Sequence, residues 1–176
     1  MNDDTRHILH HWREAVPNDR VAHLVRDTER AFRRALQARL APHGVPFGHW
    51  AFLRILWEKD GLTQKEVSAR AGVMEPTTFA AMKAMEAQGY VTRTRLPHNR
   101  KNVYVHLSER GRQLKELLVP LAEETNRVSM RDLSETEITT ARKVLLAMIM
   151  NLAQDEAAPA PSPRTRASRA PGANGA

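Results

Sequence analysis

The side chains best suited to chemistry are basic residues that flank a short turn near residue 97. Arg93 and Arg95 precede the segment LPHN, and Arg100 and Lys101 follow it directly. Guanidinium and ammonium groups that gather at a turn can bind the phosphates of a nucleic acid. We therefore expect these four side chains to contact DNA. The alternative is a hairpin whose basic residues are only solvated.

The residue types that would indicate an enzyme are missing or unsuitably placed. The chain contains no cysteine, and the patterns GxGxxG, GxxxxGK and HExxH are absent from it. His7, His10 and His11 have a helical spacing that would present two imidazoles to one metal ion, but no nearby carboxylate completes a tetrahedral set. We therefore predict that the chain is not an enzyme and holds no metal and no cofactor.

The charge of the chain favours an anionic partner. Lys and Arg number 27 against 20 Asp and Glu, which gives a formal net charge of +7. Arg164, Arg166 and Arg169 lie in residues 156–176, a Pro-, Ala-, Gly- and Ser-rich segment that we expect to be a disordered basic tail. Such a tail could bind phosphate weakly, although a passive solubilising role fits its composition better.

The chain shows no signal for a membrane or for secretion. Its longest unbroken apolar run is the seven residues from Val144 to Met150, which is far too short to cross a bilayer. The N-terminal segment starts acidic and lacks an apolar stretch. We expect a cytoplasmic protein that has no membrane partner.

Two short helices must position the basic turn. Thr63 and the glutamate three residues later form a capping box, which starts a helix that should stop before Gly72. Pro76 suits the first turn of a second helix, which should run to about Gln88 and end at the glycine that follows. Two short helices joined by a tight turn are typical of a helix-turn-helix.

The helical period separates a buried face of the second helix from a face that is free to meet DNA. Thr78, Ala81, Met82 and Met85 should face the core. On the other face, Phe79 and Ala80 could contact thymine methyl groups in place of hydrogen bonds. The amides that open the first helix could hold a phosphate. The predicted DNA contacts from the two helices are Thr63, Gln64, Lys65, Thr77, Phe79, Ala80 and Lys83.

A β-hairpin follows the two helices. The segments YVTRTR and NVYVHL alternate apolar and polar residues on either side of the basic turn. A helix-turn-helix followed by a basic hairpin is typical of a winged helix, in which one helix enters the major groove and the wing reaches phosphates or the minor groove. The predicted fold is therefore mainly α with a small β-hairpin wing, combined with a helical dimerisation domain.

The helices that flank this module carry long apolar stripes, at residues 21–40 and 138–152. These stripes hold more apolar surface than one winged helix can cover, so they should bury against a second chain in a two-fold dimer. We expect N-terminal dimerisation helices in residues 1–45, a DNA-binding domain in 46–107, C-terminal dimerisation helices in 108–155 and the tail in 156–176.

Four segments of the chain resemble the MarR family of bacterial transcriptional regulators: HWAFLRIL, GLTQKEVSARAGV, MEAQGYVTR and NRKNVYVHLSERG. The resemblance implies a homodimer with one winged helix per subunit and a small, often phenolic or aromatic carboxylate ligand that weakens DNA binding. The Asp-Arg-basic pattern of the family's wing falls on Asn99, Arg100 and Lys101, so an amide replaces the usual acid. Because the chain lacks cysteine, the peroxide-sensing branch is excluded.

The resemblance also indicates where an effector would bind, at the seam between the dimer helices and the winged helix. Candidate ligand-binding residues there are Arg20, His23, His49 and Trp50, because a carboxylate suits the basic groups and a planar ring suits the indole. We therefore expect a repressor that leaves its pseudo-palindromic operator when it binds a hydroxybenzoate or hydroxypyridine-carboxylate type of acid, and that controls an aromatic catabolic operon. The alternative is an architectural winged-helix protein that has no small-molecule ligand.

Overall fold

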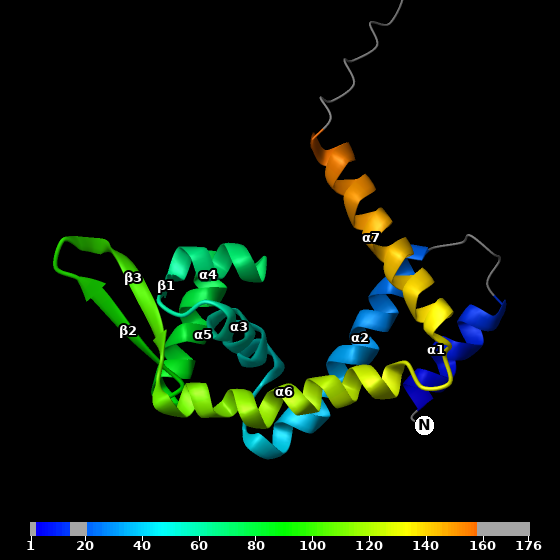
Figure 1. The fold of residues 1–176 in the computed structure, drawn as a ribbon, viewed down its shortest axis with the longest axis horizontal. Coiled ribbons are helices and arrows are strands. Elements are labelled where there is room, and N and C mark those ends of the chain that lie inside the picture. The colour runs from blue at the N-terminus through cyan, green and yellow to red at the C-terminus, as the bar shows by residue number, and fades with distance from the viewer. Residues whose placement is uncertain (1–2, 15–20, 158–176) are drawn as a thin grey trace, which may run out of the picture. The chain divides into compact units, whose positions relative to one another are not determined.

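The computed structural model describes residues 3–14 and 21–157, and the chain divides into two compact units, residues 1–131 and 132–176. Figure 1 shows a mainly helical chain with one small sheet, which confirms the predicted fold class. The first unit contains α1 (Asp3–Glu14), α2 (Val21–Leu40), the 3₁₀ helix η1 (Ala41–His43), α3 (Phe47–Glu58), β1 (Leu62–Thr63), α4 (Gln64–Ala71), α5 (Glu75–Ala87), β2 (Val91–Leu96), β3 (Asn99–Leu107) and α6 (Glu109–Ser129). The second unit contains α7 (Glu135–Ala157).

The sheet has three antiparallel strands in the order β1-β3-β2, one more than the sequence predicts. The predicted hairpin is present, with Val91 opposite Leu107 and Thr94 opposite Tyr104. The additional strand, β1, is only two residues long and pairs with β3 at Val105 and Tyr104. Because two residues cannot display a period, this strand leaves no alternating pattern in the sequence. It ties the start of α4 to the wing.

The core of the first unit lies where α3, α4 and α5 meet the sheet. Each of these helices contributes its apolar stripe, and the strands contribute the inward half of their alternating residues. The predicted core positions of α5, Thr78, Met82 and Met85, are fully buried, and Ala81 is half-buried. The other fully buried apolar residues include Leu53, Leu56, Leu62, Val67, Val91, Val105 and Leu118.

The second unit is a single described helix, α7, which begins at a capping box. Glu137 accepts a hydrogen bond from the backbone N–H of Ser134 at 2.8 Å, and the Ser134 hydroxyl accepts one from the backbone of Glu137 at 3.3 Å. No residue of α7 is buried, although the helix carries a run of large apolar side chains. Those that are exposed are Val144, Leu145, Leu146, Ile149, Met150 and Leu152. None of the described helices combines the length and the apolar character needed to cross a membrane.

Candidate nucleic-acid interface

The first helix of the predicted helix-turn-helix begins at the expected capping box. The Thr63 hydroxyl accepts a hydrogen bond from the backbone N–H of Glu66 at 3.2 Å, and the Glu66 carboxylate accepts one from the Thr63 backbone at 2.8 Å. The Thr63 hydroxyl also donates to the Glu66 carboxylate at 2.6 Å, and this bond, with the one from the Thr63 backbone, holds the pKa of Glu66 below its usual value. The cap occupies the Thr63 side chain, whereas Lys65, two residues further on, is exposed, and Gln64 is half-buried. Of the predicted contacts on α4, Lys65 is therefore the freest to reach a phosphate.

The turn between α4 and α5 is closed by local hydrogen bonds. Gly72 ends α4 with a φ of +64°, the left-handed conformation that the sequence predicts for a residue of this type after the helix. The Ser68 hydroxyl donates to the carbonyl oxygen of Val73 at 2.6 Å, and the Val73 N–H donates back to the Ser68 carbonyl at 3.3 Å. These bonds fix the direction in which α5 leaves the turn.

Helix α5 presents the face that the sequence predicts for DNA contact. Thr77, Phe79, Ala80 and Lys83 are all exposed, whereas the residues between them pack into the core. The helix begins at Glu75, one residue before the predicted start, and Pro76 occupies its first turn. An α-helix fits the major groove of DNA, and the exposed face of α5 carries both polar and apolar side chains that could contact base edges there.

The wing places two of its predicted basic contacts in solvent. Arg95 on β2 and Lys101 on β3 are exposed. The Asn99 side chain is used within the hairpin, where its Nδ2 donates to the Tyr104 hydroxyl at 3.4 Å and its Oδ1 accepts from the Asn102 backbone at 3.3 Å. The backbone of Arg100 lies in β3, but its side chain is outside the described set, so its predicted contact and the predicted role of Asn99 in orienting it stay predictions.

Arg93, the remaining predicted contact of the wing, is held by Glu86, a partner that the sequence did not predict. Its Nε and Nη2 donate to Oε2 of Glu86 at 2.9 and 2.7 Å, and its backbone N–H donates to Oε1 of the same carboxylate at 3.1 Å. These bonds hold the pKa of Glu86 below its usual value. Glu86 lies in the last turn of α5 and Arg93 lies on β2. The pair therefore joins the helix to the wing across a turn and leaves no local pattern in the sequence.

The three predicted effector residues that the structure describes, His23, His49 and Trp50, do not come together at one place. Trp50 is buried and lines a cavity of about 350 Å³ between α2, α3 and α6. Phe32, Arg33 and Arg54 also line this cavity. His49 is half-buried but does not line the cavity, and His23 is exposed on α2. Arg20 lies outside the described residues.

His49 interacts with the end of α5. Burial lowers the pKa of His49, and the polar side chain of Gln88 partly opposes that shift. Gln88 is the residue at which α5 ends. His49 therefore connects α3 to the C-terminal end of the helix that is predicted to meet DNA.

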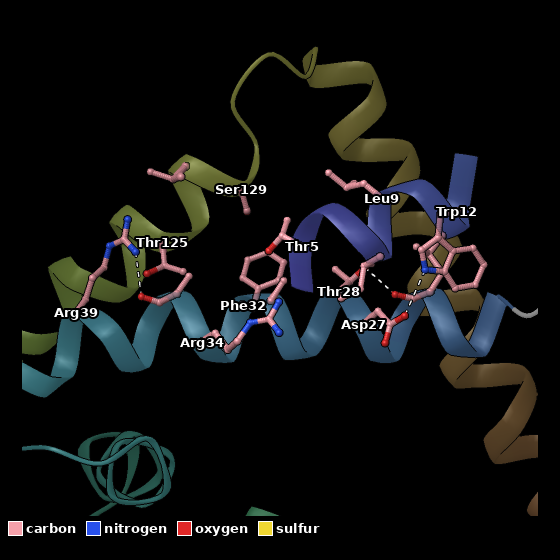
Figure 2. Close-up of a pocket in the computed structure, with 15 residues that line it drawn as sticks. Thr5, Leu9, Trp12, Asp27, Thr28, Phe32, Arg34, Arg39, Thr125 and Ser129 are labelled. Carbon is pink, nitrogen blue, oxygen red and sulfur yellow. Dashed lines mark hydrogen bonds between the residues drawn. The ribbon is translucent and has the colours of Figure 1, made fainter. Parts of the chain in front are cut away.

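A second cavity, of about 390 Å³, lies between α1, α2 and α6 (Figure 2). Its walls are mainly apolar, with Leu9 and Trp12 from α1 and Phe32 from α2. At one end, the Trp12 indole N–H donates to Oδ2 of Asp27 at 3.3 Å. The sequence does not predict this cavity, because the cavity forms only where α1, α2 and α6 meet.

The described residues contain no group of three histidines, cysteines or acids that could hold a metal ion. His10 and His11 lie on α1, and the side chain of His7 is not among those described.

Comparison with known proteins identifies the central module. The sequence model of the MarR family matches residues 48–103, which span α3 to the start of β3. The HTH-type transcriptional regulator TtmR of Methylorubrum extorquens is 35% identical over 85 residues, 48% of this chain. That match spans 44% of the relative's own length, so the chain covers less than half of it.

Solved structures share the fold at low identity. A MarR family transcriptional regulator from Listeria monocytogenes, solved in complex with a 26mer DNA, superposes with a TM-score of 0.69 at 22% identity, covering 78% of this chain and 91% of that one. The Bordetella bronchiseptica protein BpsR, whose DNA binding is regulated by 6-hydroxynicotinic acid, gives a TM-score of 0.68 at 21% identity, covering 74% of this chain and 98% of that one. Residues 48–103 of this chain therefore match the MarR family in sequence, and they have the winged-helix fold that the solved structures share.

Proposed function

We propose that this chain is a transcriptional regulator that binds a pseudo-palindromic operator as a homodimer and is released by a small aromatic acid. The observation that carries the DNA-binding part is the exposed face of α5 beside a wing with exposed basic residues. Thr77, Phe79 and Lys83 project from the helix, and Arg95 and Lys101 project from the wing. Hydrogen-bonding and apolar groups suit base edges, while cationic groups suit the flanking phosphates.

The proposed dimer is supported by apolar side chains that the described residues leave exposed to solvent. Helix α7 has no buried residue, and Val21, Leu24 and Val25 at the start of α2 are also exposed. Contiguous apolar patches of this kind mark interaction surfaces, and a second copy of the same chain offers the complementary patches. In a two-fold dimer the α5 helices would read half-sites about one helical turn apart, which matches a pseudo-palindromic operator.

The proposed effector site is the cavity beside Trp50. Its lining combines the aromatic rings of Trp50 and Phe32 with the guanidinium groups of Arg33 and Arg54 and with the carboxylates of Glu29 and Glu123. Because Arg33 pairs with Glu29 at 3.6 Å, Arg54 is the freer of the two guanidinium groups to bind the carboxylate of a planar acid. Arg33 and Arg54 take over the carboxylate-binding role that the sequence analysis expected of Arg20, His23 or His49. The regulation of BpsR by 6-hydroxynicotinic acid supports the choice of ligand class. The proposed role is that of a repressor of an aromatic catabolic operon.

Enrichment of random duplexes on the full chain tests DNA binding, and sedimentation of the complex tests the dimer. The enriched duplex, labelled with a fluorophore, is then titrated in the presence of hydroxybenzoates and hydroxypyridine carboxylates. An effector coupled to DNA binding by roughly 1–3 kcal/mol should lower DNA affinity about 5- to 150-fold, and DNA should lower effector affinity by the same factor. Arg54→Gln should reduce the response to the acid while leaving DNA affinity without the acid unchanged.

Two results would contradict parts of this proposal. If no duplex is enriched, the DNA-binding role is wrong. If a duplex is enriched but no acid of the panel shifts its binding curve, the sensing role is wrong. The architectural alternative would then explain the chain better.

A further inference from the structure

Phe79 is a large aromatic residue that lies exposed on the face of α5 proposed to meet DNA. It is 53% exposed. The guanidinium carbon of Arg93 lies 5.6 Å from the centroid of its ring, within the range of a cation–π contact. One face of this exposed ring is therefore contacted by a side chain from β2, the first strand of the wing.

Arg93 is in turn fixed by Glu86, through the two side-chain bonds and the backbone bond described above. Only 20% of the Arg93 side chain is exposed. Glu86 lies seven residues after Phe79, which is about two turns of helix, so both side chains project from the same face of α5. That spacing lets one guanidinium group reach the carboxylate and the ring together.

The ion pair also changes what Arg93 can offer to DNA. A guanidinium group whose charge is balanced by a carboxylate releases fewer counterions when a phosphate approaches. Arg95 lies two residues further along β2 and is exposed. It forms no ion pair with another described residue. Of the two arginines, Arg95 is thus the better phosphate contact.

We propose that Arg93 is a positioning residue that holds the Phe79 ring for contact with a thymine methyl group, so that Glu86, Arg93 and Phe79 set a preference for thymine in each half-site. This inference rests on the proposed DNA-binding function. The methyl group distinguishes thymine in the major groove, and a phenyl ring is one of the side chains that recognise it. A ring that is already fixed loses less rotamer freedom on binding.

The test uses the full chain and duplexes of about 30 base pairs, long enough for two half-sites one helical turn apart. After enrichment from a random pool, each thymine of the selected duplex is replaced in turn by deoxyuridine, which lacks only the methyl group. Affinity is measured by fluorescence anisotropy over a series of salt concentrations. At one thymine in each half-site, loss of the methyl should weaken binding of the unaltered protein about fourfold, the change expected for one methyl-sized group.

Four variants separate the positioning role from a phosphate contact. Phe79→Ala should bring the affinity ratio between thymine and deoxyuridine close to one. Arg93→Gln should lower the same ratio without changing the dependence of affinity on salt. Arg95→Gln is the matched control, and it should keep the ratio but lower the salt slope by about one per subunit. Glu86→Gln, which weakens the ion pair but keeps Arg93, should lower the ratio as Arg93→Gln does, and it carries this part of the test if Arg93→Gln does not fold.

Three results would overturn the inference. If Arg93→Gln and Glu86→Gln keep the fourfold ratio, then Arg93 does not position the ring. If Arg93→Gln lowers the salt slope as Arg95→Gln does, then Arg93 is a phosphate contact. If a duplex is enriched but no thymine methyl matters, the inference fails while the proposed function stands, whereas failure to enrich any duplex overturns both.

Discussion

Replacing Lys83 with Gln should weaken DNA binding by removing one phosphate contact from each subunit. Lys83 is exposed on the same face of α5 as Phe79 and Thr77 and forms no ion pair with another described residue. Glutamine keeps the length and helical preference of the side chain but removes its charge. The loss should therefore be electrostatic, and it should appear in the salt dependence of binding rather than in the stability of the fold.

The size of the effect follows from the number of exposed basic contacts. Four predicted contacts are basic, exposed and outside any ion pair with a described residue: Lys65, Lys83, Arg95 and Lys101. A dimer would offer about eight, so log affinity should fall with log salt concentration at a slope of about −7. Affinity should then drop about 10⁴-fold between roughly 50 and 200 mM salt. Lys83→Gln should make the slope about 2 units shallower, one for each subunit.

Fluorescence anisotropy of the enriched duplex over a salt series measures this slope. Arg30→Gln is the control, because Arg30 is an exposed arginine on α2, away from the winged helix. The control should leave the slope unchanged. A slope shallower than about −4 for the unaltered protein would refute the count of phosphate contacts. An equal effect of Lys83→Gln and Arg30→Gln would refute the assignment of the contact to α5.

Burial lowers the pKa of His49 from its ordinary value of 6.5, so the unfolded chain takes up this proton first as the pH falls. The stability that neutral His49 provides should be fully present above pH 6.5 and should be lost as the pH falls through the lower pKa of the folded state. His49→Asn should flatten this part of the plot of unfolding free energy against pH, measured by urea titration. An unchanged plot would contradict the burial of His49. Ser108 caps α6 and donates to the carbonyl of Gly89, so Ser108→Ala should lower the free energy of unfolding by about 1–2 kcal/mol in urea titrations. A Cβ at Gly111 would overlap the carbonyl oxygen of Tyr90, so Gly111→Ala should lower the free energy of unfolding by more than about 2 kcal/mol. An unchanged free energy of unfolding would show that α6 can shift relative to Tyr90.

Local signals in the sequence were sufficient to predict the winged helix. The capping box at Thr63 and the glycine that ends α4 act within a few residues, so their effects can be read without knowing the rest of the fold. The same holds for the two faces of α5, because the helical period alone decides that Met82 is buried while Lys83 is exposed. The alternation of β2 and β3 predicted the hairpin in the same way.

Features that depend on tertiary contacts could not be predicted. The pairing of Glu86 with Arg93 and the contact of His49 with Gln88 join separate elements, and the two cavities form only where three helices meet. The strand β1 is defined only by its pairing with β3. The effector site stays a prediction, and the sequence could not predict that Arg33 and Arg54 line the same cavity as the Trp50 indole.

The central claim is that the exposed face of α5 contacts DNA, and site-specific crosslinking tests it most directly. A photo-crosslinking amino acid is placed at position 77 on α5 in one variant and at position 30, on the basic face of α2, in another. Both proteins are irradiated with the enriched duplex under identical conditions. We expect a crosslink to bases from position 77 and none from position 30. A crosslink from position 30 with none from position 77 would show that DNA binds to α2 rather than to the winged helix.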